Sequence, residues 1–165
     1  MARRRARELA FSALFQADRG GARLDDVWRE IRSEQTSADL ADDDSADAYG
    51  DALDTEALDF AERLVHAYRD HAEEVDGLLE ASIRGWSFGQ MAQTDLNVLR
   101  LAVTEMRFEP GIPPRVTIEM AVRLAKRFGG EESGRFVNGV LAGIHRSMVG
   151  PEAAVEAEVR EDVVG

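Results

Sequence analysis

The residues best suited to chemistry stand at the start of the chain, where four arginines fall within five positions: Arg3, Arg4, Arg5 and Arg7. A guanidinium group pairs with phosphate through two parallel hydrogen bonds and stacks on unpaired bases. The cluster is therefore suited to binding single-stranded RNA. A basic N-terminus is also common as a simple solvated end, so the cluster alone leaves both interpretations open.

Residues for catalysis or metal binding are scarce. The chain has no cysteine and only three histidines, His66, His71 and His145. His66 and His71 are five positions apart, which puts them on different sides of a helix, whereas two metal ligands on one helix face are four apart. The glycine-rich residues 129–134 lack the Lys-Ser/Thr end of a phosphate-binding loop. We therefore interpret the histidines as structural or surface residues and predict no catalytic residue, no metal and no cofactor.

The overall net charge of −12 argues against nucleic-acid binding until its distribution is considered. Residues 33–62 contain eleven acids and no Lys or Arg, and residues 151–165 contain five acids and one arginine. These two segments together have a net charge of −15, so the rest of the chain is close to +3. The folded part is therefore not acidic, and its basic residues are clustered.

The elements that must position the arginines are helices, because apolar residues recur at spacings of three and four and strand-like alternation is scarcely found. The pattern predicts an all-α bundle of about seven helices. Gly20-Gly21 ends the first, Pro110-Gly111 and Gly129-Gly130 end later ones, and Pro113-Pro114 precedes another. The expected helices lie near residues 3–19, 24–32, 54–68, 74–83, 94–109, 114–128 and 136–148.

Two segments have too few large apolar residues to offset the loss of chain entropy on folding. We expect residues 33–50 to form a mobile acidic insertion and residues 151–165 to form a flexible acidic tail after Pro151. Residues 1–150 would then be a single helical domain. No run approaches 18 apolar residues, and the start lacks a signal-peptide pattern, so we expect a cytoplasmic protein with no membrane segment.

Two blocks of sequence together resemble the NusB family of transcription antitermination factors. The first is the arginine-rich opening from Arg4 to Ala10, followed by Ala13-Leu14-Phe15-Gln16. The second runs from Trp86 to Leu141 and contains Pro114-Arg115-Val116-Thr117-Ile118, Leu124-Ala125-Lys126-Arg127-Phe128-Gly129 and the quite specific Phe136-Val137-Asn138-Gly139-Val140-Leu141. The acidic insertion, the short second helix and the tail fall outside the resemblance.

The resemblance implies an all-helical factor that pairs with the ribosomal protein NusE, binds boxA RNA of nascent ribosomal RNA transcripts, and joins the elongating RNA polymerase complex through other Nus factors. By matching position, Phe15 and Asp95 would contact NusE. The residues that would face the RNA are Arg3, Arg4, Arg5, Arg7, Glu132 and Phe136.

Several of these residues also have an ordinary structural interpretation. Phe15 is four positions from Phe11 and could belong to the core. Phe136 begins an apolar stripe and could equally be buried, and Asp95 could simply support the N-terminus of its helix. We assign Arg100 and Asn138 to structure, since an asparagine among apolar residues usually satisfies backbone groups.

A competing function is a non-catalytic, protein-binding helical module related to the N-terminal domain of ribosomal RNA cytosine methyltransferases. Catalysis there requires a second domain, and this sequence contains no βαβ pattern and no glycine-rich turn for a methyl donor. We therefore predict that the chain is not an enzyme. The sequence leaves open whether the free protein is a homodimer.

Overall fold

The computed structural model describes residues 3–41, 54–83, 85 and 87–164, and for residues 37–41 and 149–164 it describes the backbone alone. Within these ranges the chain is all-helical, as predicted, with no strand. The elements are α1 (Arg3–Gly20), α2 (Leu24–Ala41), α3 (Thr55–Ser82), a 3₁₀ turn η1 (Phe88–Gln90), α4 (Gln93–Phe108), α5 (Pro114–Gly129) and α6 (Glu131–Val164).

The described residues form six α-helices instead of about seven because two expected helices are joined. α3 spans both the stretch near 54–68 and the stretch at 74–83, with one non-helical residue, His71, at φ −124° and ψ 26°. The His71 ring stacks on Phe108 with ring centroids 4.2 Å apart. The backbone thus bends at His71 and continues as a helix, so the break in apolar pattern marks a kink.

α2 is longer than the sequence predicted. It was expected over residues 24–32, but it runs to Ala41 and includes the first part of the segment expected to be a mobile insertion. Elongating an existing helix costs little, and Glu34, Gln35 and Ala38 are good helix formers. Residues 42–50 of that segment lie outside the described residues, and the mobility of the insertion stays a prediction.

α6 also passes its predicted end. The sequence placed a flexible tail after Pro151, whereas the helix continues through residues 151–164 to Val164. The composition explains this continuation, because residues 152–161 are mainly Ala and Glu, which favour helix. The tail is therefore helical, and its flexibility stays a prediction.

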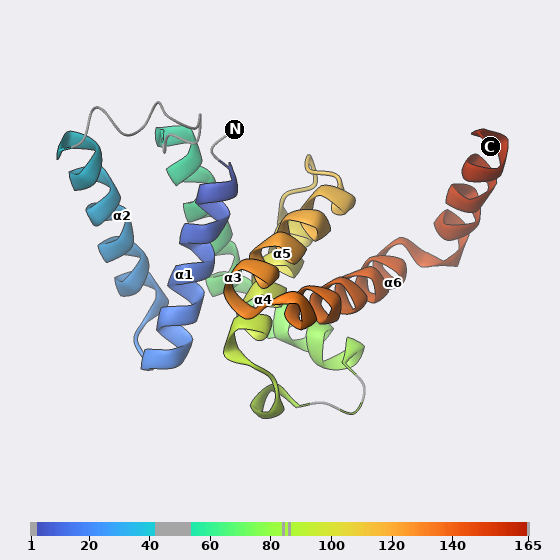
Figure 1. Cartoon of the computed structure of the whole chain (residues 1–165), viewed down its shortest axis with the longest axis horizontal. Helices are drawn as coiled ribbons and strands as arrows, with labels where there is room; N and C mark the ends of the chain where they lie inside the picture. Colours follow the sequence, from blue (N-terminus) through green and yellow to red (C-terminus); the bar gives the residue numbers. More distant parts are fainter. Residues whose placement is uncertain (1–2, 42–53, 84, 86, 165) are drawn as a thin grey trace.

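α4 forms the centre of the bundle and packs against α1, α3, α5 and α6. Ten of its residues are buried, among them Leu99 and Val103, which are completely inaccessible to solvent. α3 lies beside α1 and α4, and α5 lies beside α4 and α6. Figure 1 shows α1 between α2 on one side and the pair of α5 and α6 on the other.

The turn between α5 and α6 is tight. Gly130 has a φ of +95°, a conformation that glycine adopts without strain. A Cβ atom on Gly129 would lie 2.4 Å from the Ser133 hydroxyl, and one on Gly134 would lie 2.6 Å from the Lys126 side chain. The three glycines thus let α6 start directly beside the end of α5.

Candidate nucleic-acid interface

The first turn of α1 carries the arginine cluster, and its members do not share one environment. Arg4 and Arg5 are exposed, and Arg3 is half-buried with its guanidinium 4.8 Å from the centre of the Phe60 ring. Stacking of this kind is a favourable cation–π contact. Arg4 and Arg5 are therefore the members that present most of their side chains to solvent.

Arg7 differs from the expectation that it faces RNA together with the other three. It is 8% exposed, its Nε donates to Glu105 Oε1 over 2.6 Å, and its guanidinium lies 5.3 Å from the centre of the Phe60 ring. Glu105 is itself 1% exposed. With 3.6 residues per turn, positions 3, 4, 5 and 7 cannot all lie on one face of a helix. Arg7 therefore belongs mainly to the structure.

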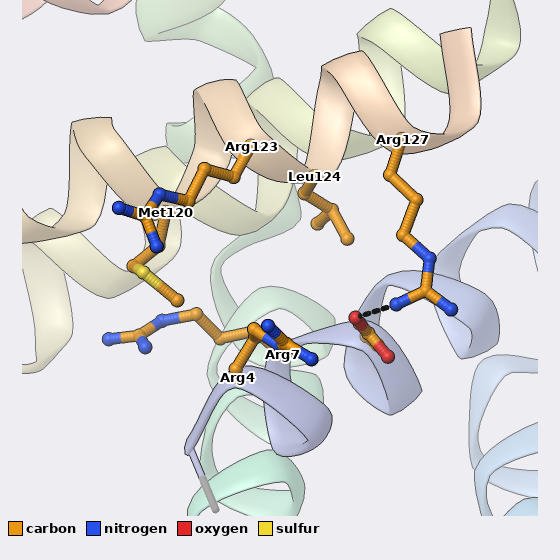
Figure 2. A pocket seen from close by; sticks show the side chains of 7 residues that line it. Arg4, Arg7, Met120, Arg123, Leu124 and Arg127 are labelled. Carbon is orange, nitrogen blue, oxygen red and sulfur yellow. Dashed lines mark hydrogen bonds and ion pairs between the residues drawn. The ribbon is translucent and has the colours of Figure 1, made fainter. Parts of the chain in front are cut away.

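Between α1 and α5 lies a pocket of about 170 Å³, which we call the arginine pocket. Figure 2 shows Arg4 and Arg7 entering it from α1, and Arg123 and Arg127 from α5. Its lining consists of Arg4, Arg7, Glu8, Met120, Arg123, Leu124 and Arg127. Sequence reasoning missed the α5 arginines. Their signal was the four-residue spacing from Arg123 to Arg127, which places both on one face of α5.

The two α5 arginines form ion pairs at the pocket rim. Arg123 donates to Glu119 over 2.9 Å on the same helix, and Arg127 donates to Glu8 of α1. The Arg123 and Arg127 side chains are 63% and 58% exposed. Exposed pairs of this kind contribute between zero and about 1 kcal/mol. A stronger anionic ligand could therefore take over these guanidinium groups at little cost.

The other two residues predicted to lie near RNA are on α6. Glu132 is exposed in its first turn, and Phe136, one turn later, is half-buried against the core. Phe136 thus packs partly on the core, and its contact with RNA stays a prediction. Asn138, which we assigned to structure, is exposed on α6. That assignment is wrong because the apolar neighbours of Asn138 point to other sides of the helix.

The opposite half of α1 carries an aromatic patch made of Phe11, Phe15 and Phe128. The Phe11 ring lies 5.7 Å from Phe15 and 5.2 Å from Phe128 of α5. Phe11 is buried, Phe15 is half-buried, and Phe128 is 48% exposed. Phe15 therefore packs on the core and still keeps an outer surface, and Phe11 contacts both Phe15 and the exposed Phe128 ring.

Asp95 lies in the first turn of α4, where a negative charge is favourable beside the free backbone amides. It is half-buried, and its Oδ1 is enclosed without a hydrogen-bond partner in the described part of the chain. Two residues further on, Asn97 donates to Asp18 of α1 over 3.1 Å. The Thr94 side chain contacts the position of Gly129, the residue after Phe128. The structure thus brings Asp95 to the same end of the molecule as the aromatic patch.

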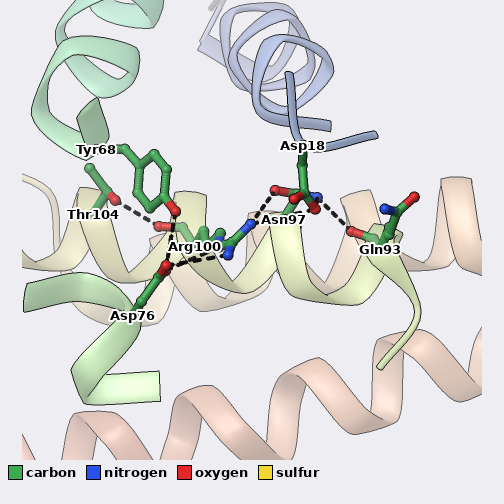
Figure 3. Close-up of polar contacts among 7 residues, drawn as sticks. All are labelled: Asp18, Tyr68, Asp76, Gln93, Asn97, Arg100 and Thr104. Atoms are coloured by element: carbon green, nitrogen blue, oxygen red, sulfur yellow. Dashed lines mark hydrogen bonds and ion pairs between the residues drawn. The ribbon is translucent and has the colours of Figure 1, made fainter. Parts of the chain in front are cut away.

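A polar cluster fixes this end of the molecule, and we call it the Arg100 network (Figure 3). Arg100 donates to both carboxylate oxygens of Asp76 over 3.0 and 3.2 Å and lies 3.5 Å from Asp18. Tyr68 donates to the same Asp76, and burial raises the pKa of its hydroxyl. The network consists of Asp18, Tyr68, Asp76, Asn97 and Arg100. It joins α1, α3 and α4, so the structural assignment of Arg100 is confirmed.

His66 and His71 lie outside the arginine pocket and the aromatic patch. His71 packs on Phe108, and His66 lines an open groove between α2 and α3. Over the residues that the structure describes, no three His, Cys, Asp or Glu side chains come together in a way that could hold a metal ion. In the same part of the chain, no helix is long and apolar enough to cross a membrane.

Comparisons with known proteins agree on one family. The NusB family model matches residues 4–146. A transcription antitermination protein NusB of Thermus thermophilus is 46% identical over 156 residues, which cover 94% of this chain and 98% of the relative. One of Deinococcus deserti is 50% identical over 146 residues, covering 88% of this chain and 82% of the relative.

Solved structures give the same result. T. maritima NusB superposes with a TM-score of 0.72 at 35% identity, covering 87% of this chain and 90% of that one. A crystal structure of the antitermination factors NusB and NusE in complex with dsRNA gives a TM-score of 0.72 at 28% identity, covering 89% and 99%. The shared helical fold, the family match and the close relatives show that this chain belongs to the NusB family.

Proposed function

We propose that this chain is a transcription antitermination factor that pairs with NusE, binds single-stranded boxA RNA of nascent ribosomal RNA transcripts, and joins the elongating polymerase in the cytoplasm through other Nus factors. The observation that carries the proposal is that the two ends of α1 present different kinds of side chain, in a chain that belongs to the NusB family. Its N-terminal end presents exposed arginines, and its C-terminal end presents an aromatic patch. The role is one of binding and requires no catalytic group.

The RNA-binding part of the proposal is supported by Arg4 and Arg5, which are exposed at the very start of the domain. Guanidinium groups reach the phosphates of a flexible strand and stack on its splayed bases. Arg3 supplies a partly shielded charge beside them, and we propose that Glu132 and Phe136 border the same RNA path on α6. Arg7 acts indirectly, because its pair with Glu105 fixes the first two turns of α1 against α4.

The partner-binding part is supported by the aromatic patch. Among the residues that the structure describes, Phe128 is the one large apolar side chain that is exposed. Its ring contacts Phe11, which also contacts Phe15. Aromatic side chains with an exposed face are typical centres of protein interfaces. Asp95 lies at the same end and supplies a charge that orients the partner. We propose that NusE covers this patch.

The test is a titration of boxA-containing RNA with the full chain, with and without NusE. We expect weak binding by the chain alone and tighter binding with NusE, because two proteins then contact one strand. Asp95→Lys should weaken NusE binding and leave the intrinsic RNA affinity nearly unchanged. RNA affinity that does not depend on salt would contradict the proposal, since phosphate binding releases counterions. An absence of RNA binding in this titration would favour a protein-binding module without RNA.

A further inference from the structure

We propose that the arginine pocket binds one backbone phosphate of the RNA strand and so carries the strand from α1 across α5. This inference rests on the proposed function. It adds Arg123 and Arg127 to a site for which the sequence predicted contacts on α1 and α6 alone. The ligand chemistry is a phosphate group, and the source is a phosphodiester of single-stranded RNA.

The geometry supports a phosphate because four guanidinium groups from two helices line one concavity (Figure 2). Arg7 is held by Glu105 and forms a fixed wall of the pocket. Arg4, Arg123 and Arg127 are exposed at the rim and can turn toward a ligand. Converging arginines give several charge-assisted hydrogen bonds to one phosphate, and these are stronger than bonds between neutral groups.

The balance of charge also favours an anion. Glu8 is the single carboxylate that lines the pocket, against four arginines. Glu105 and Glu119 pair with Arg7 and Arg123 from outside the lining. The Glu119–Arg123 pair is exposed on both sides, and the Glu8–Arg127 pair is exposed on the arginine side, so both are weak. A phosphate can therefore displace Glu8 or Glu119 without breaking the fold.

The apolar part of the lining identifies the source of the phosphate. Met120 and Leu124 stand between the arginines of α1 and those of α5. A free phosphate ion gains nothing from an apolar wall, whereas a nucleotide can pack its ribose or base against one. The combination of charged rim and apolar wall thus fits a segment of RNA better than an inorganic ion.

The position of the pocket gives the strand a continuous path. The exposed arginines lie on α1, whereas Glu132 and Phe136 lie on α6. α5 packs along α6, and its Arg127 bonds to Glu8 of α1. Arg127 precedes the tight turn at Gly130, which leads directly to Glu132. A strand that touches both predicted surfaces would therefore pass the arginines of α5.

The first test compares Arg123→Gln with Arg29→Gln in the complex with NusE and boxA RNA. Each change removes one exposed arginine from an ion pair within its own helix, with Glu119 in α5 or with Asp26 in α2. We expect about a tenfold loss of RNA affinity for Arg123→Gln, as for losing a charged hydrogen bond. Its salt slope should fall by about 0.7, the value for one phosphate contact on a single strand. Arg29→Gln should change neither.

The second test locates the phosphate. RNA oligonucleotides with one neutral methylphosphonate linkage at successive positions should lose affinity for the wild-type complex at each contacted linkage. At one linkage the Arg123→Gln complex should show a smaller loss than the wild-type complex, because one of the contacts to that phosphate is already gone. Circular dichroism melting of each variant checks that the fold is intact. Equal sensitivity of wild type and variant at every linkage would overturn the proposal.

The outcomes separate this inference from the proposed function. RNA binding by the wild-type complex that weakens in Arg123→Gln supports both the phosphate site and the proposed function. RNA binding that is unchanged in Arg123→Gln overturns the pocket and leaves the proposed function standing, whereas no RNA binding by the wild type with NusE overturns both. A further titration with inorganic phosphate tests the source. If phosphate binds in the millimolar range or tighter and Arg123→Gln abolishes that binding while leaving RNA affinity unchanged, the pocket is a free-phosphate site and the RNA assignment is wrong.

Discussion

The arginine pocket and the Arg100 network use the same side chain in opposite ways. In the network, the Arg100 side chain is 12% exposed and bonds to Asp76 and Asn97. In the pocket, the Arg123 and Arg127 side chains are more than half exposed, and each is paired with one exposed or partly exposed carboxylate. An enclosed arginine with several fixed partners holds helices together, while an exposed arginine with a weak partner can exchange it for a ligand.

α1 takes part in both regions. Its first two turns supply Arg4, Arg7 and Glu8 to the pocket, and its last turns supply Asp18 to the network. Arg7 is the exception within the pocket, because its burial and its bond to Glu105 resemble the network. α1 therefore carries both side chains with fixed partners and exposed arginines that can bind a ligand. Substitutions can separate the effects of the two kinds.

The largest expected effect comes from removing Glu105, the buried partner of Arg7. Glu105→Ala should lower the free energy of unfolding by about 3–5 kcal/mol, since it leaves a charge buried without its partner. Urea unfolding followed by circular dichroism measures this change. Glu105→Gln keeps the size and one acceptor oxygen and should cost less. Wild-type stability in Glu105→Ala would show that Arg7 does not depend on this pair.

The next effect concerns the Arg100 network. Arg100→Ala should lower the free energy of unfolding by about 1.5–3 kcal/mol, the range for lost hydrogen bonds to charged groups. Asp76 and Asp18 keep some exposure, at 26% and 31% of their side chains, which moderates the loss. Arg100→Lys keeps the charge without the planar fork and should be intermediate. The folded variant should bind RNA as the wild type does. A selective loss of RNA affinity would show that the Arg100 network also takes part in RNA binding.

The exposed arginines should show the reverse behaviour. Replacing Arg4 and Arg5 together with Ala should change the free energy of unfolding by less than about 0.5 kcal/mol, as for surface positions. RNA affinity in the presence of NusE should fall more than about tenfold and depend less on salt, because two charged contacts are lost. Arg29→Ala is the matched control on α2. A marked loss of stability in the double variant would show that Arg4 or Arg5 stabilises the fold.

The smallest expected effect is a pH-dependent change in stability from the ion pairs of Arg69. Arg69 of α3 donates to Asp25 of α2 and to Asp70, and these bonds hold the pKa of both carboxyl groups below the usual range. Folded-state pKa values below the unfolded ones add stability at neutral pH that is lost as the pH falls through the lowered values. The Tm difference between wild type and Arg69→Gln should therefore be small at about pH 7 and vanish near pH 2. A difference that grows in acid would contradict this assignment.

Much of the fold could be predicted from the sequence because helical periodicity and glycine or proline stops are local signals. Gly20-Gly21, Pro113-Pro114 and Gly129-Gly130 bound helices in the structure as expected. The kink at His71 could not be predicted, since stacking on Phe108 depends on a residue 37 positions away. The ends of α2 and α6 were also misplaced. Low apolar content argues against a core contact, but it does not prevent Ala- and Glu-rich residues from continuing a helix.

The sequence by itself determined the family, the all-helical class and the location of the α1 arginines, because these depend on residue types in order and on local spacing. Only the tertiary structure decided how each arginine is used. Glu105 is 98 positions from Arg7, and Glu8 is 119 positions from Arg127. Whether an arginine is enclosed beside a carboxylate or left at the rim of a pocket depends on which helices meet there. A pattern along one helix cannot specify that contact, since burial and pairing belong to two surfaces at once.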